Sequence, residues 1–301
     1  MPWTAHDRPF LDPAVVARLG TLELKARTIV EGLLSGLHRS PFKGFSVEFA
    51  EYRQYIPGDD IATIDWKVYA RSDRYVIKKF EEETNLDCHV MLDVSGSMGY
   101  GAHHGMSKFE YGACLAASLG YLMHRQRDAV GLTAFDEEIV TMLPASSRPG
   151  HLLSLLVTLD RLKTAHRTNV SKPLHQLAET LTKRGIVVLI SDLLDDPDDI
   201  VRGLKHFQFR GIDVIVFHVL DHDEIEFPFE RATRFEDLET SEEIMAVPGA
   251  VRAHYLKEMG ALIERYRREL GSNGIDYQLV NTSQPLELAL LSYLSTRSRS
   301  L

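Results

Sequence analysis

Oxygen-bearing side chains recur at three separate places in this sequence. The segment Asp93-Val94-Ser95-Gly96-Ser97 alternates an aspartate and two serines with other residues, and Gly96 allows the sharp turn that would bring all three together. Thr168 precedes a predicted helix, and Ser191-Asp192 follows a predicted strand. Such oxygens suit a hard cation, because magnesium takes six oxygen ligands in near-octahedral geometry and keeps several waters. We therefore predict a Mg²⁺ site, with Mn²⁺ or Ca²⁺ as alternatives, formed by Asp93, Ser95, Ser97, Thr168 and Asp192.

Each of these residues, taken singly, also has a simpler structural explanation. Asp93 could accept backbone N–H groups in a tight turn, and Ser97 could be an ordinary turn residue. Thr168 could serve only as a helix N-cap, where serine and threonine are preferred. The joint position of the three segments favours the metal site, because each lies where an α/β sheet places its ligands.

The elements that position these residues alternate in type from residue 86 onward. We expect apolar strands over 88–92, 129–135, 139–143, 186–191, 213–220 and 276–280. We expect helices over 107–125, 150–162, 170–182, 197–209, 249–270 and 286–295. Continuous apolar strands between helices indicate an α/β fold with a doubly wound, mostly parallel sheet. Ligands of such sheets bind at the carboxyl ends of strands, where the strand order reverses.

The first 80 residues have a different pattern. Apolar residues at helical spacing predict one or two helices within 12–38, with a break near Gly20. Alternating apolar and polar residues predict strands within 43–80. We therefore expect an N-terminal helix-plus-strand appendage over 1–80 and an α/β domain over 81–301.

Composition narrows the classes of function. The 301 residues carry a formal net charge of −9, which argues against nucleic-acid binding and against attraction to an anionic membrane. No apolar run is long enough to span a bilayer, and the N-terminus lacks the apolar core of a secretory signal. The two cysteines, Cys88 and Cys114, fall in predicted buried elements and indicate structural thiols. A cytoplasmic protein without direct membrane insertion is expected.

The candidate metal residues resemble the three-loop metal-ion-dependent adhesion site (MIDAS) of von Willebrand factor type A domains. Further segments resemble the bacterial family named "domain of unknown function 58", and the similarity runs from about residue 33 to residue 280. These segments are Phe49–Asp60, Ile64–Trp66, Ala70-Arg71, Asp93–Met98, Leu220–Pro228 and Phe235–Thr240.

The resemblance implies a von Willebrand type A fold. It also implies direct metal contacts from Ser95, Ser97 and Thr168, and contacts from Asp93 and Asp192 that are direct or pass through water. Many family members have membrane-spanning segments before this region, whereas this chain shows none. Members often accompany MoxR-type AAA+ ATPases. The implied function is that of a metal-dependent protein-binding adaptor or co-chaperone in which a protein partner supplies an acidic side chain to the metal.

Two other functions remain open from the sequence. A metal-dependent phosphoester hydrolase would need a general base, for which His104 and Asp136 are the candidates. An ion could also serve only to tie the three loops together. Neither a Ser/His/Asp triad order nor a phosphate-binding Gly-x-x-x-x-Gly-Lys-Ser/Thr loop is evident, so we expect a binding module and not an enzyme.

Several other polar clusters have structural interpretations that we prefer. The pair His103-His104 is expected to be solvated, and Asp196 is expected to cap a helix that begins at Pro197. His218, Asp221, His222 and Asp223 are expected to be structural and not a second metal site. A further polar group is formed by Asp59, Asp60, Asp65 and Arg71. It could be a partner surface or a polar network around Trp66, and the sequence does not favour one over the other.

Overall fold

The computed structural model describes residues 12–38, 52–54, 69, 75–78, 87–164 and 170–300. The chain divides into two compact units, one formed by Ser40–Asn85 and the other by Met1–Arg39 together with Leu86–Leu301. In the smaller unit, strand β1 (Tyr52–Gln54) pairs antiparallel with β2 (Val76–Lys78). The larger unit carries the candidate site.

A six-stranded sheet forms the centre of the larger unit, in the order β10-β7-β6-β3-β4-β5. All neighbouring pairs are parallel except β4 and β5. The chain leaves β3 toward one edge of the sheet and leaves β6 toward the other, so the order reverses between these two adjacent strands. The strands are β3 (Asp87–Asp93), β4 (Ala129–Phe135), β5 (Ile139–Ser146), β6 (Gly185–Ser191), β7 (Asp213–Leu220) and β10 (Asp276–Asn281).

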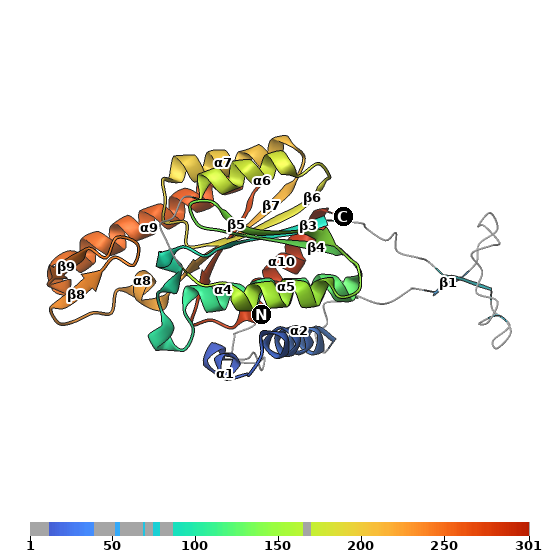
Figure 1. The fold of residues 1–301 in the computed structure, drawn as a ribbon, viewed down its shortest axis with the longest axis horizontal. Coiled ribbons are helices and arrows are strands. Elements are labelled where there is room, and N and C mark those ends of the chain that lie inside the picture. The colour runs from blue at the N-terminus through green and yellow to red at the C-terminus, as the bar shows by residue number, and fades with distance from the viewer. Residues whose placement is uncertain are drawn as a thin grey trace. The chain divides into compact units, whose positions relative to one another are not determined.

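Helices cover both faces of this sheet (Figure 1). Helices α6 (Ser171–Thr180), α7 (Pro197–Phe209) and α9 (Pro248–Ser272) pack on one face. The other face carries α4 (Lys108–Gln126), α5 (His151–Arg161) and α10 (Leu286–Ser300), with α2 (Leu22–His38) packed against α4 and α10. The short α1 (Pro13–Ala17) precedes α2. The predicted α/β fold with a doubly wound, mostly parallel sheet is confirmed.

Helix α4 is nearly surrounded by other elements. Its side chains are buried along most of its length because the sheet lies on one side and α2 and α10 lie on the other. Small residues permit this close packing: a Cβ atom on Gly112 would lie 3.0 Å from Leu92 Cδ1. Ser107 caps the helix in a capping box with Glu110, which fixes where α4 begins.

The N-terminal helices belong to the larger unit. Our prediction grouped everything up to residue 80 into one appendage, whereas the structure separates residues 40–85 and keeps α2 with the sheet domain. The physical reason is burial, since Ile29, Val30 and Leu33 of α2 are at most 2% exposed and α2 packs on α4 and α10. Helical spacing shows that α2 has an apolar face but does not show which surface covers it.

The segment after β7 has more regular structure than the sequence suggested. It begins with the short helix α8 (His222–Glu226) and continues as an antiparallel hairpin of β8 (Thr233–Glu236) and β9 (Glu243–Ala246). An aromatic cluster joins the hairpin base to α9, in which Phe227 stacks on Phe235 and contacts Phe229 and Tyr255. Ile244 and Met245 of β9 remain 66% and 69% exposed.

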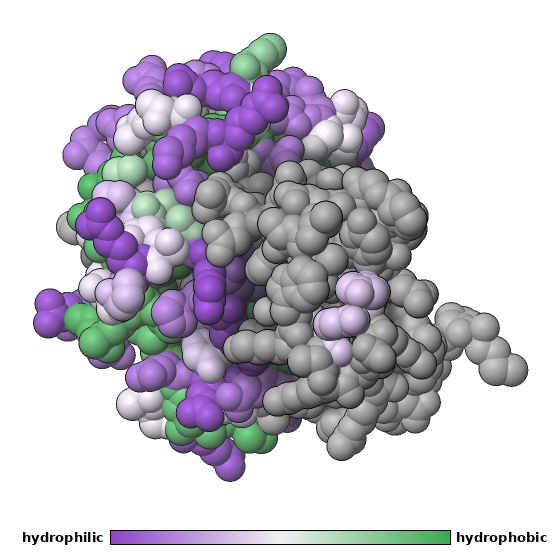
Figure 2. Space-filling view, turned by 90° about the vertical axis from the view of Figure 1, so that its right-hand side faces the viewer, coloured by the Kyte–Doolittle hydropathy of each residue, from purple (hydrophilic) through white to green (hydrophobic). Residues whose placement is uncertain are grey.

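On the face that Figure 2 shows, the described surface is mainly hydrophilic, with small separated hydrophobic areas. None of the helices in the described part of the chain has both the length and the apolar character needed to cross a membrane.

Candidate functional site

Asp93 ends β3 and is fully buried. Its Oδ1 accepts the backbone N–H of Ser95 at 2.9 Å, and its Oδ2 accepts the hydroxyl of Ser191 at 2.6 Å. Ser191 is the last residue of the neighbouring strand β6, so this hydrogen bond joins the two strand ends at the point where the sheet order reverses. Neutral donors thus hold both oxygens of the carboxylate.

Ser95 precedes a short 3₁₀ turn, Gly96–Gly99, which contains Ser97. Their hydroxyl groups share a hydrogen bond in which the oxygens lie 3.1 Å apart. Two neighbouring ligands of an octahedral magnesium ion stand about 3 Å apart when the metal–oxygen distances are about 2.1 Å. The two hydroxyls therefore converge as a pair of ligands in one coordination shell would.

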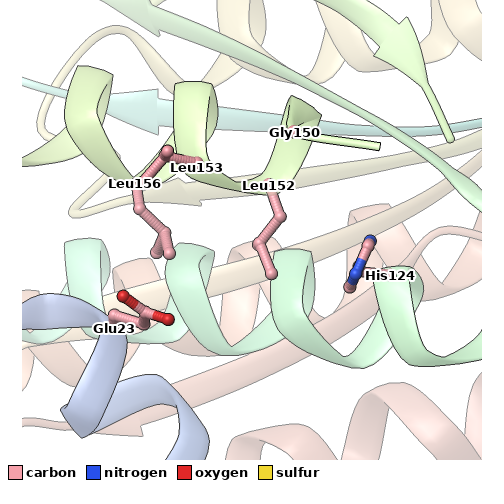
Figure 3. A pocket seen from close by; sticks show the side chains of 6 residues that line it. All are labelled: Glu23, His124, Gly150, Leu152, Leu153 and Leu156. Atoms are coloured by element: carbon pink, nitrogen blue, oxygen red, sulfur yellow. The ribbon is translucent and has the colours of Figure 1, made fainter. Parts of the chain in front are cut away.

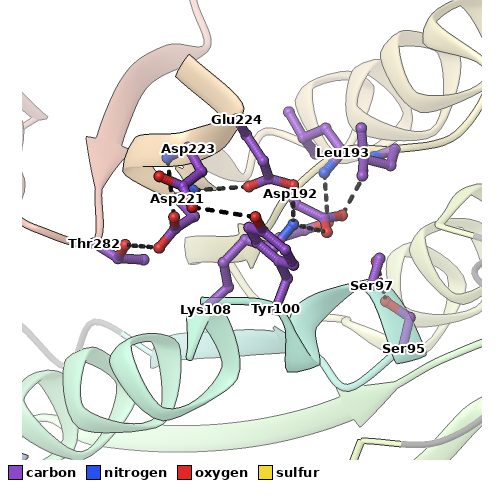
Figure 4. A network of polar contacts seen from close by, with 12 residues as sticks. Ser95, Ser97, Tyr100, Lys108, Asp192, Leu193, Asp221, Asp223, Glu224 and Thr282 are labelled. Atoms are coloured by element: carbon purple, nitrogen blue, oxygen red, sulfur yellow. Dashed lines mark hydrogen bonds and ion pairs between the residues drawn. The ribbon is translucent and has the colours of Figure 1, made fainter. Parts of the chain in front are cut away.

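Asp192 lies directly after β6 and is also fully buried (Figure 4). Its Oδ2 accepts a hydrogen bond from Lys108 Nζ at 2.7 Å, and its Oδ1 accepts one from the backbone N–H of Leu194 at 3.3 Å. Lys108 is the first residue of α4, and the same Nζ donates to Glu224 Oε1 at 2.7 Å. One buried ammonium is therefore shared between two carboxylates.

The charges of these groups do not balance. Burial, followed by repulsion from Asp192, raises the pKa of Asp93 to about 7. Burial alone would lower the pKa of Lys108, but its contacts with Asp192 and Glu224 outweigh this and raise it. Burial also raises the pKa of Glu224. Among the described residues, no lysine or arginine contacts Asp93, so its charge lacks a cationic partner.

A second polar network borders the site at the end of β7. Asp221 caps α8 in a capping box with Glu224, and its Oδ2 accepts the hydroxyl of Thr282 at 2.7 Å. Gly101, in the loop after Ser97, has a φ of 96°, and a Cβ there would lie 2.5 Å from Asp221 Oδ2. The loop that carries the two serines therefore packs tightly against the start of α8.

Four of the five predicted metal residues lie at the ends of two adjacent strands. Asp93 and the two serines lie at the end of β3, and Asp192 lies at the end of β6 beside it. The remaining residues lie outside the described residues: Thr168 of the metal prediction, and Asp59, Asp60, Asp65, Trp66 and Arg71 of the N-terminal block.

Sequence reasoning missed Lys108, Glu224 and the hydrogen bond from Ser191. One signal was present for Lys108, because a lysine at the first position of a helix opposes the helix dipole and needs an anion nearby. Nothing in the sequence pairs Glu224 with that lysine, since the contact joins residues 116 positions apart.

The other polar clusters are built into the structure. Asp196 caps α7 with Pro197 following, as predicted. His218 is buried and shares a 2.7 Å hydrogen bond with the hydroxyl of Tyr277, while burial lowers its pKa to about 4. His103 is about half exposed, as a loop histidine should be, but its Nε2 also lies 2.9 Å from Asp223 Oδ2. These contacts give His103, His218 and Asp223 hydrogen-bond partners within the fold.

The residues present fit a hard divalent ion. In the part of the chain that the structure describes, no group of three or more His, Cys, Asp or Glu side chains is placed to hold a metal. The candidate set depends instead on two converging hydroxyls and two buried carboxylates, which are oxygen donors of the type that magnesium prefers. The uncompensated charge of Asp93 is the feature that a cation would relieve.

The hydrolase candidates gain no support from their contacts. Asp136 follows β4, and its Oδ1 accepts the backbone N–H of Glu138 in the turn to β5. The side chain of His104 lies outside the described residues. The described contacts therefore give no support to Asp136 as a general base.

A pocket of about 200 Å³ lies elsewhere, among α2, α4 and α5 (Figure 3). Leucines form much of its lining, and Glu23 and His124 lie well apart across it. His124 is in the last turn of α4, whereas Lys108 opens that helix, so this pocket is separate from the candidate site.

A protein-family model described as "Protein of unknown function DUF58" matches residues 51–262. The chain belongs to this family. Uncharacterized proteins of Mycobacterium tuberculosis and Mycobacterium bovis are 28% identical to it over 220 residues, which cover 72% of this chain and 68% of those proteins. The family assignment from the sequence is confirmed, but these relatives carry no stated function.

Solved structures with a similar fold come from Bacteroides. The conserved hypothetical protein BatB of Bacteroides thetaiotaomicron superposes with a TM-score of 0.51 at 19% identity, covering 72% of this chain and all of that one. An aerotolerance-related membrane protein of Bacteroides fragilis superposes with a TM-score of 0.51 at 21% identity, covering 70% of this chain and 98% of that one. At such identities the similarity shows the fold alone.

Proposed function

We propose that this DUF58 protein is a metal-dependent protein-binding module. Its recognition site would be the edge of the sheet where β3 and β6 end, and its ion would be Mg²⁺. The carrying observation is the 3.1 Å separation of the Ser95 and Ser97 hydroxyls beside the buried, uncompensated Asp93. This cluster lies at the reversal of strand order, where sheets of this class bind their ligands.

Each residue has a separate task in this proposal. Ser95 and Ser97 would contact the ion directly as neutral ligands, and Asp93 and Asp192 would supply negative charge, directly or through water. Ser191 and the Ser95 backbone hold Asp93 in place, and Lys108 holds Asp192. The bound ion would supply an open coordination position for a carboxylate of a partner protein.

The partner in this proposal is a MoxR-type AAA+ ATPase, by analogy with the resemblance described above, and the cytoplasm is the compartment. The chain would then act as an adaptor or co-chaperone in the assembly or activation of other complexes.

Thermal unfolding in EDTA and in Mg²⁺ tests the ion. We expect Mg²⁺ to raise the melting temperature of the wild type and to leave Asp93→Ala unchanged. Asp136→Ala is the matched control, because Asp136 directly follows the neighbouring strand β4 and accepts only a backbone N–H of the turn; it should keep the Mg²⁺ response. A wild type that does not respond to Mg²⁺, Mn²⁺ or Ca²⁺ contradicts the proposal.

Pull-down with a MoxR-type ATPase encoded beside this gene tests the partner. We expect binding in Mg²⁺, loss of binding in EDTA, and loss in Ser95→Ala with the fold intact. Binding that ignores both EDTA and Ser95→Ala would remove the serine cluster from recognition.

A further inference from the structure

Lys108 occupies an unusual position for a lysine. Its side chain is fully buried, and it stands at the first position of α4, where the positive end of the helix dipole disfavours a cation. Its only compensation among the described residues is the pair of 2.7 Å contacts with Asp192 and Glu224. The lysine is therefore held by one carboxylate of the candidate metal site and by one carboxylate outside it.

The contact with Asp192 places a cation inside the candidate metal site. The Oδ2 of Asp192 accepts the hydrogen bond from the Lys108 ammonium. Its Oδ1 accepts only a long 3.3 Å hydrogen bond from the backbone N–H of Leu194, so Oδ1 could contact an ion or a water bound to that ion. A divalent ion near the serines and the ammonium would share one carboxylate. Two cations this close repel each other strongly in a buried site.

Glu224 gives the ammonium a second anion. Glu224 is fixed by its own Oε2, which accepts the backbone N–H of Asp221 at 2.7 Å in the capping box of α8. Its side chain is 17% exposed, whereas Asp192 is fully buried. Lys108 can thus stay paired with Glu224 when an ion draws on Asp192, so loading the site does not require an unpaired buried lysine.

We propose that Lys108 is a built-in counter-cation that neutralises Asp192 in the absence of metal and lowers the affinity of the site for divalent ions. The inference rests on the proposed function and adds a regulatory property to the same site. Because the positive charge of Lys108 lowers the ion affinity of the site, added negative charge should raise that affinity. An acidic side chain of a partner protein would supply such a charge. Ion and acidic partner should therefore bind cooperatively.

Two substitutions should move the ion affinity in opposite directions. Lys108→Met removes the repelling cation, so we expect Mn²⁺ to bind at least tenfold more tightly, as measured by electron paramagnetic resonance of free Mn²⁺ on the full chain. Glu224→Gln leaves the ammonium to Asp192 alone and removes one negative charge, so we expect weaker binding by a similar factor. Lys108→Arg keeps the charge and should stay nearer to the wild type than Lys108→Met.

A merely structural role for Lys108 gives a different pattern, because loosening the site by either substitution would weaken Mn²⁺ binding in both variants. If Lys108→Met does not fold, Glu224→Gln still tests the inference, because unchanged or tighter Mn²⁺ binding in that variant overturns it. If the wild type binds Mn²⁺ and Lys108→Met binds it with equal or lower affinity, the inference is overturned while the proposed function stands. If Lys108→Met binds Mn²⁺ and the wild type does not, the inference is supported, but the proposed metal dependence of the wild-type protein is contradicted. Binding by neither variant nor wild type ends both proposals.

Discussion

The ends of β3 and β6 form two neighbouring regions that differ in how they hold a buried aspartate. Asp93 and Asp192 are both fully buried and follow adjacent parallel strands. Asp93 receives only hydrogen bonds from uncharged groups, whereas Asp192 receives an ammonium. The comparison shows that two buried aspartates at neighbouring strand ends can have different electrostatic partners, uncharged donors for one and a cation for the other.

Because of this difference, the two strand ends should respond differently to a bound cation. At the β6 end the protein supplies its own cation, because the ammonium of Lys108 contacts both Asp192 and Glu224. At the β3 end the negative charge is left uncompensated, so that end is where a bound cation would contribute most. Substitutions at the two ends should therefore have different effects on stability and on ion response.

The largest expected effect comes from breaking the ion pair at the β6 end. Lys108→Met leaves the buried Asp192 and the partly buried Glu224 without their cation. We therefore expect a loss of about 3–5 kcal/mol in the free energy of unfolding, measured in urea with EDTA present. Lys172→Met is the matched control, because Lys172 pairs with Glu138 on the surface, and its loss should cost less than about 1 kcal/mol. Equal losses in the two variants would erase the contrast.

The pH dependence should identify the β3 end. The pKa of Asp93 is about 7 in the folded protein, above its ordinary value near 3.9 in the unfolded chain. The folded state therefore binds more protons than the unfolded state between these values. The stability contribution of Asp93 is fully present below pH ~4 and is lost as the pH rises to ~7, by at most about 1.4 kcal/mol per pH unit.

Asp93→Asn removes this titration. In EDTA we expect the variant to gain stability relative to the wild type as the pH rises from 4 to 8, in urea unfolding measured at each pH. Mg²⁺ should restore the wild type at pH 8 and do little at pH 5, where a proton competes for the same carboxylate. A stability difference between the two proteins that is independent of pH would show that Asp93 is ionised throughout.

A smaller effect tests how the β3 end is held. Ser191→Ala removes the hydroxyl that donates to Asp93 Oδ2, so a buried acceptor loses its partner and we expect a cost of about 1–3 kcal/mol. Ser118→Ala is the control, because the buried Ser118 hydroxyl donates only to a helix carbonyl, that of Cys114; its loss should cost less. Urea unfolding in EDTA compares the two, and equal costs would remove Ser191 as a support of Asp93.

An effect no larger than that of Ser191→Ala concerns the loop after Ser97, which packs on the start of α8. Gly101→Ala would place a Cβ 2.5 Å from Asp221 Oδ2 in a backbone with positive φ, so we expect a loss of about 1–3 kcal/mol. Gly150→Ala has a positive φ of 85° as well but meets nothing within 4 Å, so its loss should be smaller. Thermal unfolding measures both, and a Gly150 variant that is the less stable would contradict the close packing of the loop on α8.

Local patterns carried most of the fold prediction. The strands Ala129–Phe135 and Asp213–Leu220 and the helix Pro197–Phe209 were predicted with the bounds that the structure shows, because apolar runs, a capping aspartate and a proline mark them directly. The hairpin of β8 and β9 was missed, because each strand has only four residues and β9 leaves its apolar residues exposed.

The candidate site was predicted only in part. Spacing and strand context located Asp93, Ser95, Ser97 and Asp192 at one edge of the sheet. The partners that set their charge come from distant parts of the chain, and a sequence pattern does not reveal which buried lysine meets which carboxylate. The electrostatic contrast between the two aspartates therefore emerges only from tertiary contacts such as those of Lys108.

The placement of α2 has a practical consequence for dissecting this protein. The unit that contains the sheet is formed by two separate segments of the chain, one that includes α2 and one that begins at Leu86. Residues 40–85 form the smaller unit and are inserted between these two segments. A fragment that starts at β3 would lose α2 and leave the apolar outer surface of α4 and α10 exposed to water. We expect such a fragment to aggregate, whereas replacing residues 40–85 by a short flexible linker should give a folded sheet domain.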